Sequence, residues 1–171
     1  MMQPEPDRPN GESEITSVVM RRLNAAPRSR GELTTYLLSK DFDPAVIDSV
    51  LDRVTSMAYI DDAQYAQEWV RSRHRSRGLA PSVLKRELIS KDIDVAMIDS
   101  ALEQLSLQDT LERAHELAAK KYRSLLTVDA AVAVRRIASL LQRKGYPPDL
   151  CFQIAKETVG ADVVADGELD Q

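Results

Sequence analysis

The fold of this chain is decided by a stretch that occurs twice: SKDFDPAVIDSVL at residues 39–51 and SKDIDVAMIDSAL at residues 90–102. Nine of the thirteen aligned positions are identical, and the mismatches are mostly apolar exchanges. A fainter copy follows 53 residues further on, at Ile137, Leu141, Lys144, Tyr146, Pro148, Cys151 and Ile154. A period of about fifty residues is typical of repeat arrays, in which each unit packs against its neighbours. We therefore expect three repeats in an elongated molecule, with Cys151 as a buried apolar residue.

Helix signals recur in groups of three along the repeats. Ser29 followed by Glu32 is a capping box, and Asp43 before Pro44 is a cap with a first-turn proline. Comparable caps and helix breakers follow at Asp61 or Asp62, Gly78, Pro81, Asp94, Asp109, Gly145 and Pro148. No stretch alternates apolar and polar residues with a period of two, so no sheet is expected. The sequence predicts an all-α fold with nine helices in three tandem three-helix repeats.

The two ends of the chain differ in charge from its body. The net charge is -4, yet the body from Ile15 to Lys156 has 22 basic and 18 acidic residues, because acids are concentrated at the ends. The first fourteen residues also contain three prolines, Gly11 and almost nothing apolar, and both this end and the end after about Gly160 are predicted to be disordered acidic tails. The predicted organisation is a tail at residues 1–14, repeats at residues 15–58, 59–106 and 107–159, and a second tail at residues 160–171.

Motifs that would indicate catalysis, a cofactor or a metal ion are weak throughout the chain. The six glycines are scattered, which argues against a phosphate-binding loop, and His74 and His115 have no metal-ligand spacing. The adjacent Asp61 and Asp62 are better explained as a helix cap and a partner of the helix dipole than as catalytic acids. We expect no enzyme, no cofactor and no metal site. A signal peptide and membrane-spanning apolar runs are also lacking, which predicts a cytoplasmic protein.

The strongest electrostatic feature is a basic stretch in the second repeat. It has one acid, Glu87, and seven bases: Arg71, Arg73, Arg75, Arg77, Lys85, Arg86 and Lys91. A helix C-terminus gains little from four arginines, so the stretch either binds a partner or forms a solvated face. The first repeat has a smaller basic cluster at Arg21, Arg22, Arg28 and Arg30, and the third has one at Arg135, Arg136, Arg143 and Lys144. The predicted partner-binding residues are Arg71, Arg73, Arg75, Arg77, Lys85, Arg86, Arg135, Arg136, Arg143 and Lys144.

Three further features of these stretches have two interpretations each. Tyr65 and Trp69 are four residues apart on one helix and either stack on a partner or pack with Ala66 and Val70 inside the repeat, and we favour packing. The equivalent lysines near a helix end either stabilise the helix dipole or contact a partner: Lys40, Lys91 and Lys144. In the third repeat, residues 136 and 143 are two helical turns apart and share a side, which favours one joint patch.

The segment from Tyr59 to Ile93 reads YIDDAQYAQEWVRSR at residues 59–73, then Gly78, then LKRELISKDI at residues 84–93. It resembles the central motif of the RecX family, the cytoplasmic bacterial regulators of the recombinase RecA. RSRGEL at residues 28–33 and RKGY at residues 143–146 are similar to the family's first and third repeats, so the resemblance covers about residues 15–157. The family usually has glycine where this chain has Asp41 and Asp92. Because aspartate enters the left-handed conformation at small cost, we expect a change in turn strain rather than in fold.

The resemblance implies a fold and a function. The three repeats would form an extended, curved array that binds along the groove of the RecA filament on single-stranded DNA. Such binding would inhibit strand exchange, ATP hydrolysis and co-protease activity during DNA repair and recombination in the SOS response. The implied partner is this filament, with direct contact to DNA as a further possibility, and the protein is expected to be a non-enzymatic monomer.

Two other functions fit an all-α chain with a basic body. A DNA-binding protein could use the three-helix units as tandem helix-turn-helix readers, which predicts tight binding to naked DNA with a steep salt dependence. No evident recognition helix combines arginine with asparagine or glutamine for base reading, which argues against this alternative. A passive helical scaffold would tolerate charge reversal of Arg73, Arg77, Lys85 and Arg86 together.

Overall fold

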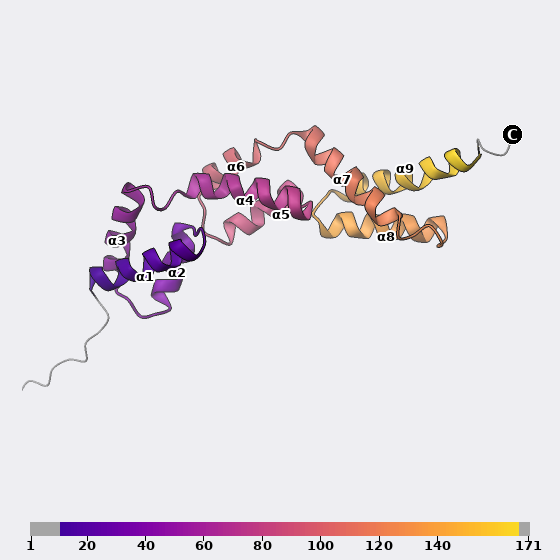
Figure 1. Ribbon diagram of the computed structural model, residues 1–171. Helices are drawn as coiled ribbons and strands as arrows, with labels where there is room; N and C mark the ends of the chain where they lie inside the picture. Colours follow the sequence, from indigo (N-terminus) through magenta and orange to yellow (C-terminus); the bar gives the residue numbers. More distant parts are fainter. Residues whose placement is uncertain (1–10, 168–171) are drawn as a thin grey trace, which may run out of the picture. The chain divides into compact units, whose positions relative to one another are not determined.

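The computed structural model describes residues 11–167, with side chains described as far as residue 160 (Figure 1). This part of the chain has nine α-helices and no strand: α1 (Glu12–Ala25), α2 (Arg30–Leu38), α3 (Pro44–Ser56), α4 (Asp62–Arg77), α5 (Pro81–Ile89), α6 (Val95–Leu102), α7 (Leu107–Tyr122), α8 (Ala130–Arg143) and α9 (Pro148–Gly167). The predicted all-α class is confirmed. The described residues form two compact units: unit 1 comprises residues 11–68 and 87–101, and unit 2 comprises residues 69–86 and 102–167. Helices α4 and α5 of the second repeat therefore contribute residues to both units.

Unit 1 has its core between the first three helices. Helices α1 and α2 both pack against α3. The core consists of Ile15, Val19, Leu33, Leu37, Phe42, Ile47, Val50, Leu51, Val54 and Ile60. Burial of each large apolar side chain stabilises the fold by about 1.5–3 kcal/mol relative to leaving it exposed. The positions that the repeat predicts as apolar are thus the positions that hold this unit together.

Unit 2 has a separate core built mainly by α7, α8 and α9, which pack on one another. Its buried members are Ala80, Ala114, Ala118, Leu125, Ala133, Ile137, Ala138, Leu141, Tyr146, Cys151, Ile154, Ala155 and Val159. Cys151 is fully buried, as its alignment with Ile47 and Ile98 predicts, and burial raises the pKa of its thiol. The third copy of the repeat therefore builds a core of its own despite its weak similarity.

Most helices begin at the predicted caps, with one clear difference. The predicted capping box of α2 is present, since Ser29 Oγ accepts from the backbone N–H of Glu32 while the Glu32 carboxylate accepts from that of Ser29. Helix α7, however, begins at Leu107 because Ser106 is its cap, and the predicted cap Asp109 is the capping-box partner of that serine.

The helices extend into both stretches that were predicted to be tails. Helix α1 begins at Glu12 and helix α9 continues to Gly167. The remainder of the tail predictions concerns residues 1–10 and 168–171, which lie outside the described residues.

The turn after the second helix of each repeat has the same backbone conformation. Asp41 has a φ of 60°, Asp92 a φ of 57° and Gly145 a φ of 93°, all in the left-handed region. The two aspartates therefore adopt the conformation for which glycine is usually selected, as expected, and the turn is conserved among the three repeats at a cost of about 1–2 kcal/mol for each aspartate.

Candidate functional site

Six of the seven bases of the basic stretch lie within unit 2, on the C-terminal half of α4 and the start of α5, whereas the seventh, Lys91, belongs to unit 1. Arg73 is half-buried, and its guanidinium carbon lies 4.1 Å from the centroid of the Trp69 ring, which fixes the arginine by a cation–π contact. Arg75 and Arg77 are exposed at the end of α4, and Arg86 is exposed on α5. We call the whole set the α4 cluster: Arg71, Arg73, Arg75, Arg77, Lys85 and Arg86.

The aromatic residues of α4 have internal contacts. The Tyr65 hydroxyl donates to Glu32 Oε2 at 3.1 Å, and Ala66 and Val70 are fully buried beside it. The packing interpretation of Tyr65 is thus confirmed, and the tyrosine contacts α2 of the first repeat as well as Lys91 of its own repeat. Trp69 is half-buried beneath Arg73. The Trp69 ring is consequently part of the scaffold that positions Arg73.

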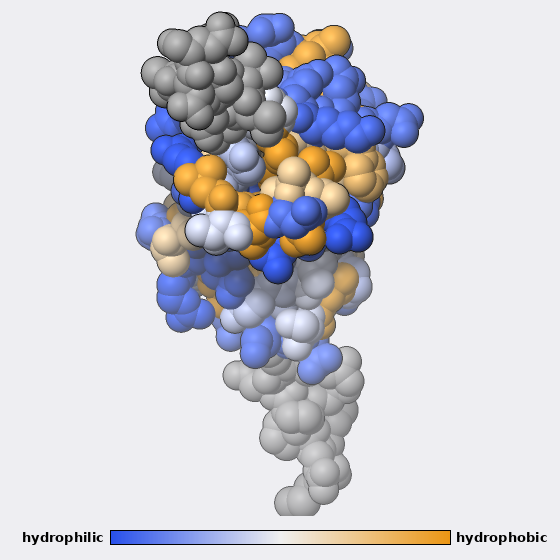
Figure 2. All heavy atoms as spheres, turned by 90° about the vertical axis from the view of Figure 1, so that its right-hand side faces the viewer, coloured by the Kyte–Doolittle hydropathy of each residue, from blue (hydrophilic) through white to orange (hydrophobic). Residues whose placement is uncertain are grey.

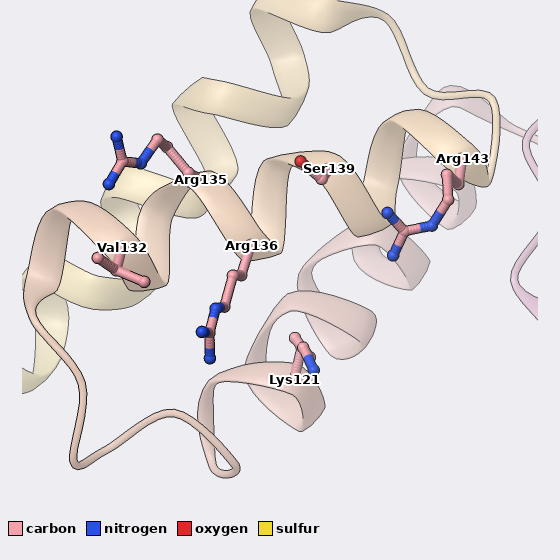
Figure 3. Close-up of a pocket in the computed structure, with 6 residues that line it drawn as sticks. All are labelled: Lys121, Val132, Arg135, Arg136, Ser139 and Arg143. Atoms are coloured by element: carbon pink, nitrogen blue, oxygen red, sulfur yellow. The ribbon is translucent and has the colours of Figure 1, made fainter.

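A second basic surface lies along one face of α8. An open groove of about 470 Å³ is lined by Lys121 of α7 and by five residues of α8, which we call the α8 groove: Lys121, Val132, Arg135, Arg136, Ser139 and Arg143. In Figure 3 the side chains of Arg136 and Arg143 extend toward α7, where Lys121 lies, and Arg135 projects away from it. The predicted shared side of residues 136 and 143 is therefore confirmed, whereas Lys144 is half-buried at the end of α8 and does not line the groove.

The charges in the α8 groove are not neutralised by the rest of the described chain. Within residues 11–160, Lys121, Arg136 and Arg143 make neither an ion pair nor a side-chain hydrogen bond. Lys121 was not predicted as a site residue, because it lies in a mixed sequence, LAAKKYRS, with no repeat equivalent that would single it out. Only the packing of α7 on α8 brings this lysine to the arginines.

Basic residues of the first repeat are used differently. Arg22 lies over the Tyr36 ring at 3.6 Å, Arg28 is 3.7 Å from Glu32, and Arg30 pairs with Asp52 at 2.9 Å. Arg21 is exposed. The first of the three predicted basic clusters is therefore largely occupied by contacts within unit 1.

The start of α2 is joined to the turn that follows α5, and we call this contact the first joint. Ser29 Oγ donates to the carbonyl oxygen of Lys91 at 2.8 Å, and Lys91 Nζ lies 2.8 Å from Glu32 Oε1. Gly31 lies so close to Asp92 that a Cβ at position 31 would collide with the Cβ of the aspartate. All of these residues belong to unit 1, so the joint is one of its internal contacts.

Two carboxylates contribute to the start of α2, one of them within the first joint. Burial alone would raise the pKa of Glu32, but hydrogen bonds from Lys91 and from the Ser29 N–H lower it below its ordinary value of 4.5. Asp62 Oδ1 accepts from the Arg30 N–H at 2.9 Å and so caps α2 from outside, while Asp61 caps α4 through the N–H of Gln64. Burial raises the pKa of Asp62. Asp61 therefore caps α4, where a cap is predicted, and Asp62 caps α2, which the sequence does not predict.

The start of α5 makes the equivalent contact in unit 2, which we call the second joint. The Ala80 N–H donates to the carbonyl oxygen of Lys144 at 2.9 Å, and Ser82 Oγ donates to that of Gly145 at 2.7 Å. Val83, at the repeat position of Glu32, lies against Gly145. In both joints, therefore, the turn of the next repeat packs against the same face of the second helix of the repeat before it.

Other surface features do not form a comparable site. Figure 2 faces the end of unit 2 where α7 meets α8 and shows hydrophobic areas among hydrophilic ones. Exposed hydrophobic side chains of this unit are Leu107, Leu126 and Phe152, which do not line the α8 groove. The described residues contain no group of acids, histidines and cysteines that could hold a metal ion, and no helix among them is long and apolar enough to cross a membrane.

Comparisons with known proteins match all three repeats. Family models for RecX match in chain order: the first three-helix domain at residues 17–53, the second at residues 61–102 and the third at residues 108–154. The chain is 34% identical over 146 residues to the "Regulatory protein RecX" of Streptomyces coelicolor, covering 85% of this chain and 78% of the relative. It is 34% identical over 160 residues to the protein of the same name from Mycobacterium ulcerans, covering 93% and 92%.

A solved structure has the same fold. The crystal structure of RecX from Lactobacillus salivarius is similar with a TM-score of 0.75 and 24% sequence identity, covering 86% of this chain and 96% of that one. At this identity the similarity concerns the fold alone.

Proposed function

The chain belongs to the RecX family, and from this premise we propose that it regulates a RecA recombinase by binding the filament that RecA forms on single-stranded DNA. The proposed effect is inhibition of strand exchange, ATP hydrolysis and co-protease activity. The protein acts by occupying the filament, without a catalytic step of its own. The proposed contact residues are Arg71, Arg73, Arg75, Arg77, Lys85, Arg86, Arg135, Arg136, Arg143 and Lys144.

The observation that supports this proposal is the accumulation of exposed, unneutralised bases in unit 2. Arg75, Arg77 and Arg86 of the α4 cluster are exposed, and none of them is in an ion pair with another described residue. Placing several unpaired arginines together on a solvated face does not stabilise the fold, since like charges repel one another. A filament of acidic protein and DNA phosphates would neutralise them.

The alternative function, DNA reading by tandem helix-turn-helix units, is disfavoured by the two joints as far as α2 and α5 would be the recognition helices. A recognition helix inserts its N-terminal residues into the major groove. In α2 and α5 these residues already contact the turns at Lys91 and Lys144, so they are not available to base edges. The proposal therefore expects weak, sequence-independent contact with free DNA rather than specific reading.

The decisive test is the single-strand-dependent ATPase of RecA with the purified protein added below stoichiometric amounts. The wild type should inhibit it. A variant in which Arg75, Arg77 and Arg86 are replaced by Gln should need about tenfold more protein for the same inhibition, because three charge contacts are lost. The matched control replaces three exposed bases outside both surfaces by Gln: Arg21, Arg123 and Lys156. Absence of inhibition by the wild type would refute the proposed function, and equal effects of both variants would refute the α4 cluster as its site.

A further inference from the structure

The groove lies on the face of α8 that corresponds to the faces of α2 and α5 in the other two repeats. In those two helices this face contacts a turn. Arg135 is at the repeat position of Gly31 and Ser82, and Arg136 is at that of Glu32 and Val83. Those residues contact the turns at Asp92 and Gly145. Arg135 and Arg136 are instead exposed. The third repeat thus presents an open version of a surface whose two other copies are occupied.

The charge at the key position of this face is reversed in the third repeat. In the first joint Glu32 attracts the lysine of the incoming turn, Lys91. In the third repeat the equivalent Arg136 would repel such a lysine, including Lys40 of the first repeat in a second copy of the chain. The open face is therefore unsuited to extending the array with another copy and is suited to an anionic partner.

We propose that the α8 groove binds the phosphate backbone of DNA. Arg136 and Arg143 are seven residues apart on α8, about 10 Å along the helix axis, and they extend toward Lys121. Three cations at this spacing can contact phosphates one or two nucleotides apart along a strand. Guanidinium groups match phosphate oxygens with two parallel hydrogen bonds, and Ser139 adds a donor between the arginines.

The composition of the groove favours a phosphate backbone over a protein partner. Val132 is the one apolar residue among its six lining residues, and none is aromatic. Protein interfaces have an apolar, aromatic-rich centre, whereas interfaces with DNA are polar and strongly basic. Without an aromatic ring the groove has no platform for base stacking, so binding is independent of sequence.

The inference rests on the proposed function, because a RecA filament presents DNA phosphates as well as protein. The test contains no recombinase, so the two proposals can fail separately. Fluorescence anisotropy of labelled oligonucleotides, single-stranded and duplex in separate arms, measures the Kd of the whole chain at salt concentrations of roughly 50–200 mM. The two arms establish which form of DNA supplies the phosphates.

The test variant carries Arg136→Glu and Arg143→Glu, and its control carries Arg21→Glu and Lys156→Glu, exposed bases outside both surfaces with the same change in net charge. The Kd of the test variant should rise about tenfold or more, with a salt dependence shallower by roughly 1.4–1.8 in log–log slope, and the control should change it less than about threefold. A milder variant, Arg136→Gln with Arg143→Gln, should show a smaller rise and retain the thermal stability of the wild type.

Equal losses in test variant and control would overturn the proposal, since the effect would then come from net charge alone. An unchanged Kd of the test variant for both forms of DNA would also overturn it, because the groove would then make no contact with DNA phosphates.

Discussion

The two joints place the same elements in contact by different means. The first is polar: Glu32, Lys91 and Tyr65 form a partly buried network, with Ser29 donating to the incoming turn. The second has no ion pair at the equivalent place, because Val83 replaces Glu32. Close to it in the chain, the Tyr146 hydroxyl donates to the carbonyl oxygen of Gly78 at 3.2 Å, and burial raises the pKa of this tyrosine to about 12.

What the joints share is close backbone approach on a face without room for a side chain. In the first joint the residue without a Cβ is Gly31, on the receiving helix, and it faces Asp92. In the second it is Gly145, on the incoming turn, and it faces Ser82 and Val83. A repeat joint therefore needs one glycine, on either side, and tolerates exchange of the surrounding polar contacts for apolar ones.

The largest expected effect comes from adding a methyl group to either glycine. Gly31→Ala and Gly145→Ala should each lower the free energy of unfolding by about 2–3 kcal/mol, the first through overpacking against Asp92 and the carbonyl oxygen of Lys91, the second through overpacking and its φ of 93°. Urea unfolding followed by circular dichroism measures both. Fluorescence of Trp69, the single tryptophan, reports on unit 2 and should respond more to Gly145→Ala.

A second substitution should restore stability to the Gly31→Ala variant more than to the Gly145→Ala variant. Asp92→Gly should restore about 1 kcal/mol to Gly31→Ala, because it removes the opposing Cβ and the left-handed strain together. Val83→Ala should not rescue Gly145→Ala to the same extent, since the backbone strain remains. Gly160→Ala is the control, because nothing lies within 4 Å of the added Cβ and alanine favours the helix by about 1 kcal/mol. Full recovery of stability in both double variants would contradict the claim that backbone strain contributes to the cost in the second joint.

Much of this architecture follows from the repeat, and the reason is physical. Apolar positions such as Leu33 and Ile47, and caps such as Ser29, act locally or through burial, and both leave periodic traces in the sequence. The groove around Arg136 was foreseen in part, because two arginines at helical spacing are also a local pattern. Lys121 was not, since its place beside α8 depends on tertiary packing alone.

The sequence does not predict the joints, for the same reason. The lysine position shared by Lys91 and Lys144 was recognised, but whether it serves the helix dipole, a partner or a neighbouring repeat depends on which residue lies opposite. Lys91 pairs with Glu32, whereas the equivalent position on α5 is Val83, and both residues lie about sixty residues earlier in the chain than the lysine. Long-range pairs of this kind leave no periodic signal.

A smaller effect is expected from removing the two equivalent lysine charges. Lys91→Met should cost about 1–2 kcal/mol, because it leaves the half-buried Glu32 with only the longer ion pair to Arg28 and interrupts the contact with Tyr65. Lys144→Met should change the free energy of unfolding by less than about 0.5 kcal/mol, since no described acid pairs with Lys144. The same urea titrations measure both. Equal costs would mean that the lysines serve the helix dipole in both repeats and that the polar network adds nothing.

The smallest expected effect is a pH dependence found in the first joint alone. Because the folded state lowers the pKa of Glu32, its ionised form stabilises the fold above pH 4.5, and this contribution is lost as the pH falls through the lowered value. The stability difference between wild type and Glu32→Gln should therefore be largest near neutral pH and shrink below pH 4.5, by less than about 1 kcal/mol because the carboxylate is partly exposed. The raised pKa of Asp62 is common to both proteins and cancels in the difference.

The second joint provides the matched control for this pH dependence. The difference between wild type and Val83→Ala should not vary between pH 7 and pH 3, because no carboxylate occupies that position. Both differences are measured by urea unfolding at each pH, with each variant compared with the wild type under the same conditions. If the Glu32→Gln difference were as constant as that of Val83→Ala, the hydrogen bonds of Glu32 would survive its protonation, and the first joint would be held by shape, as the second is, rather than by charge.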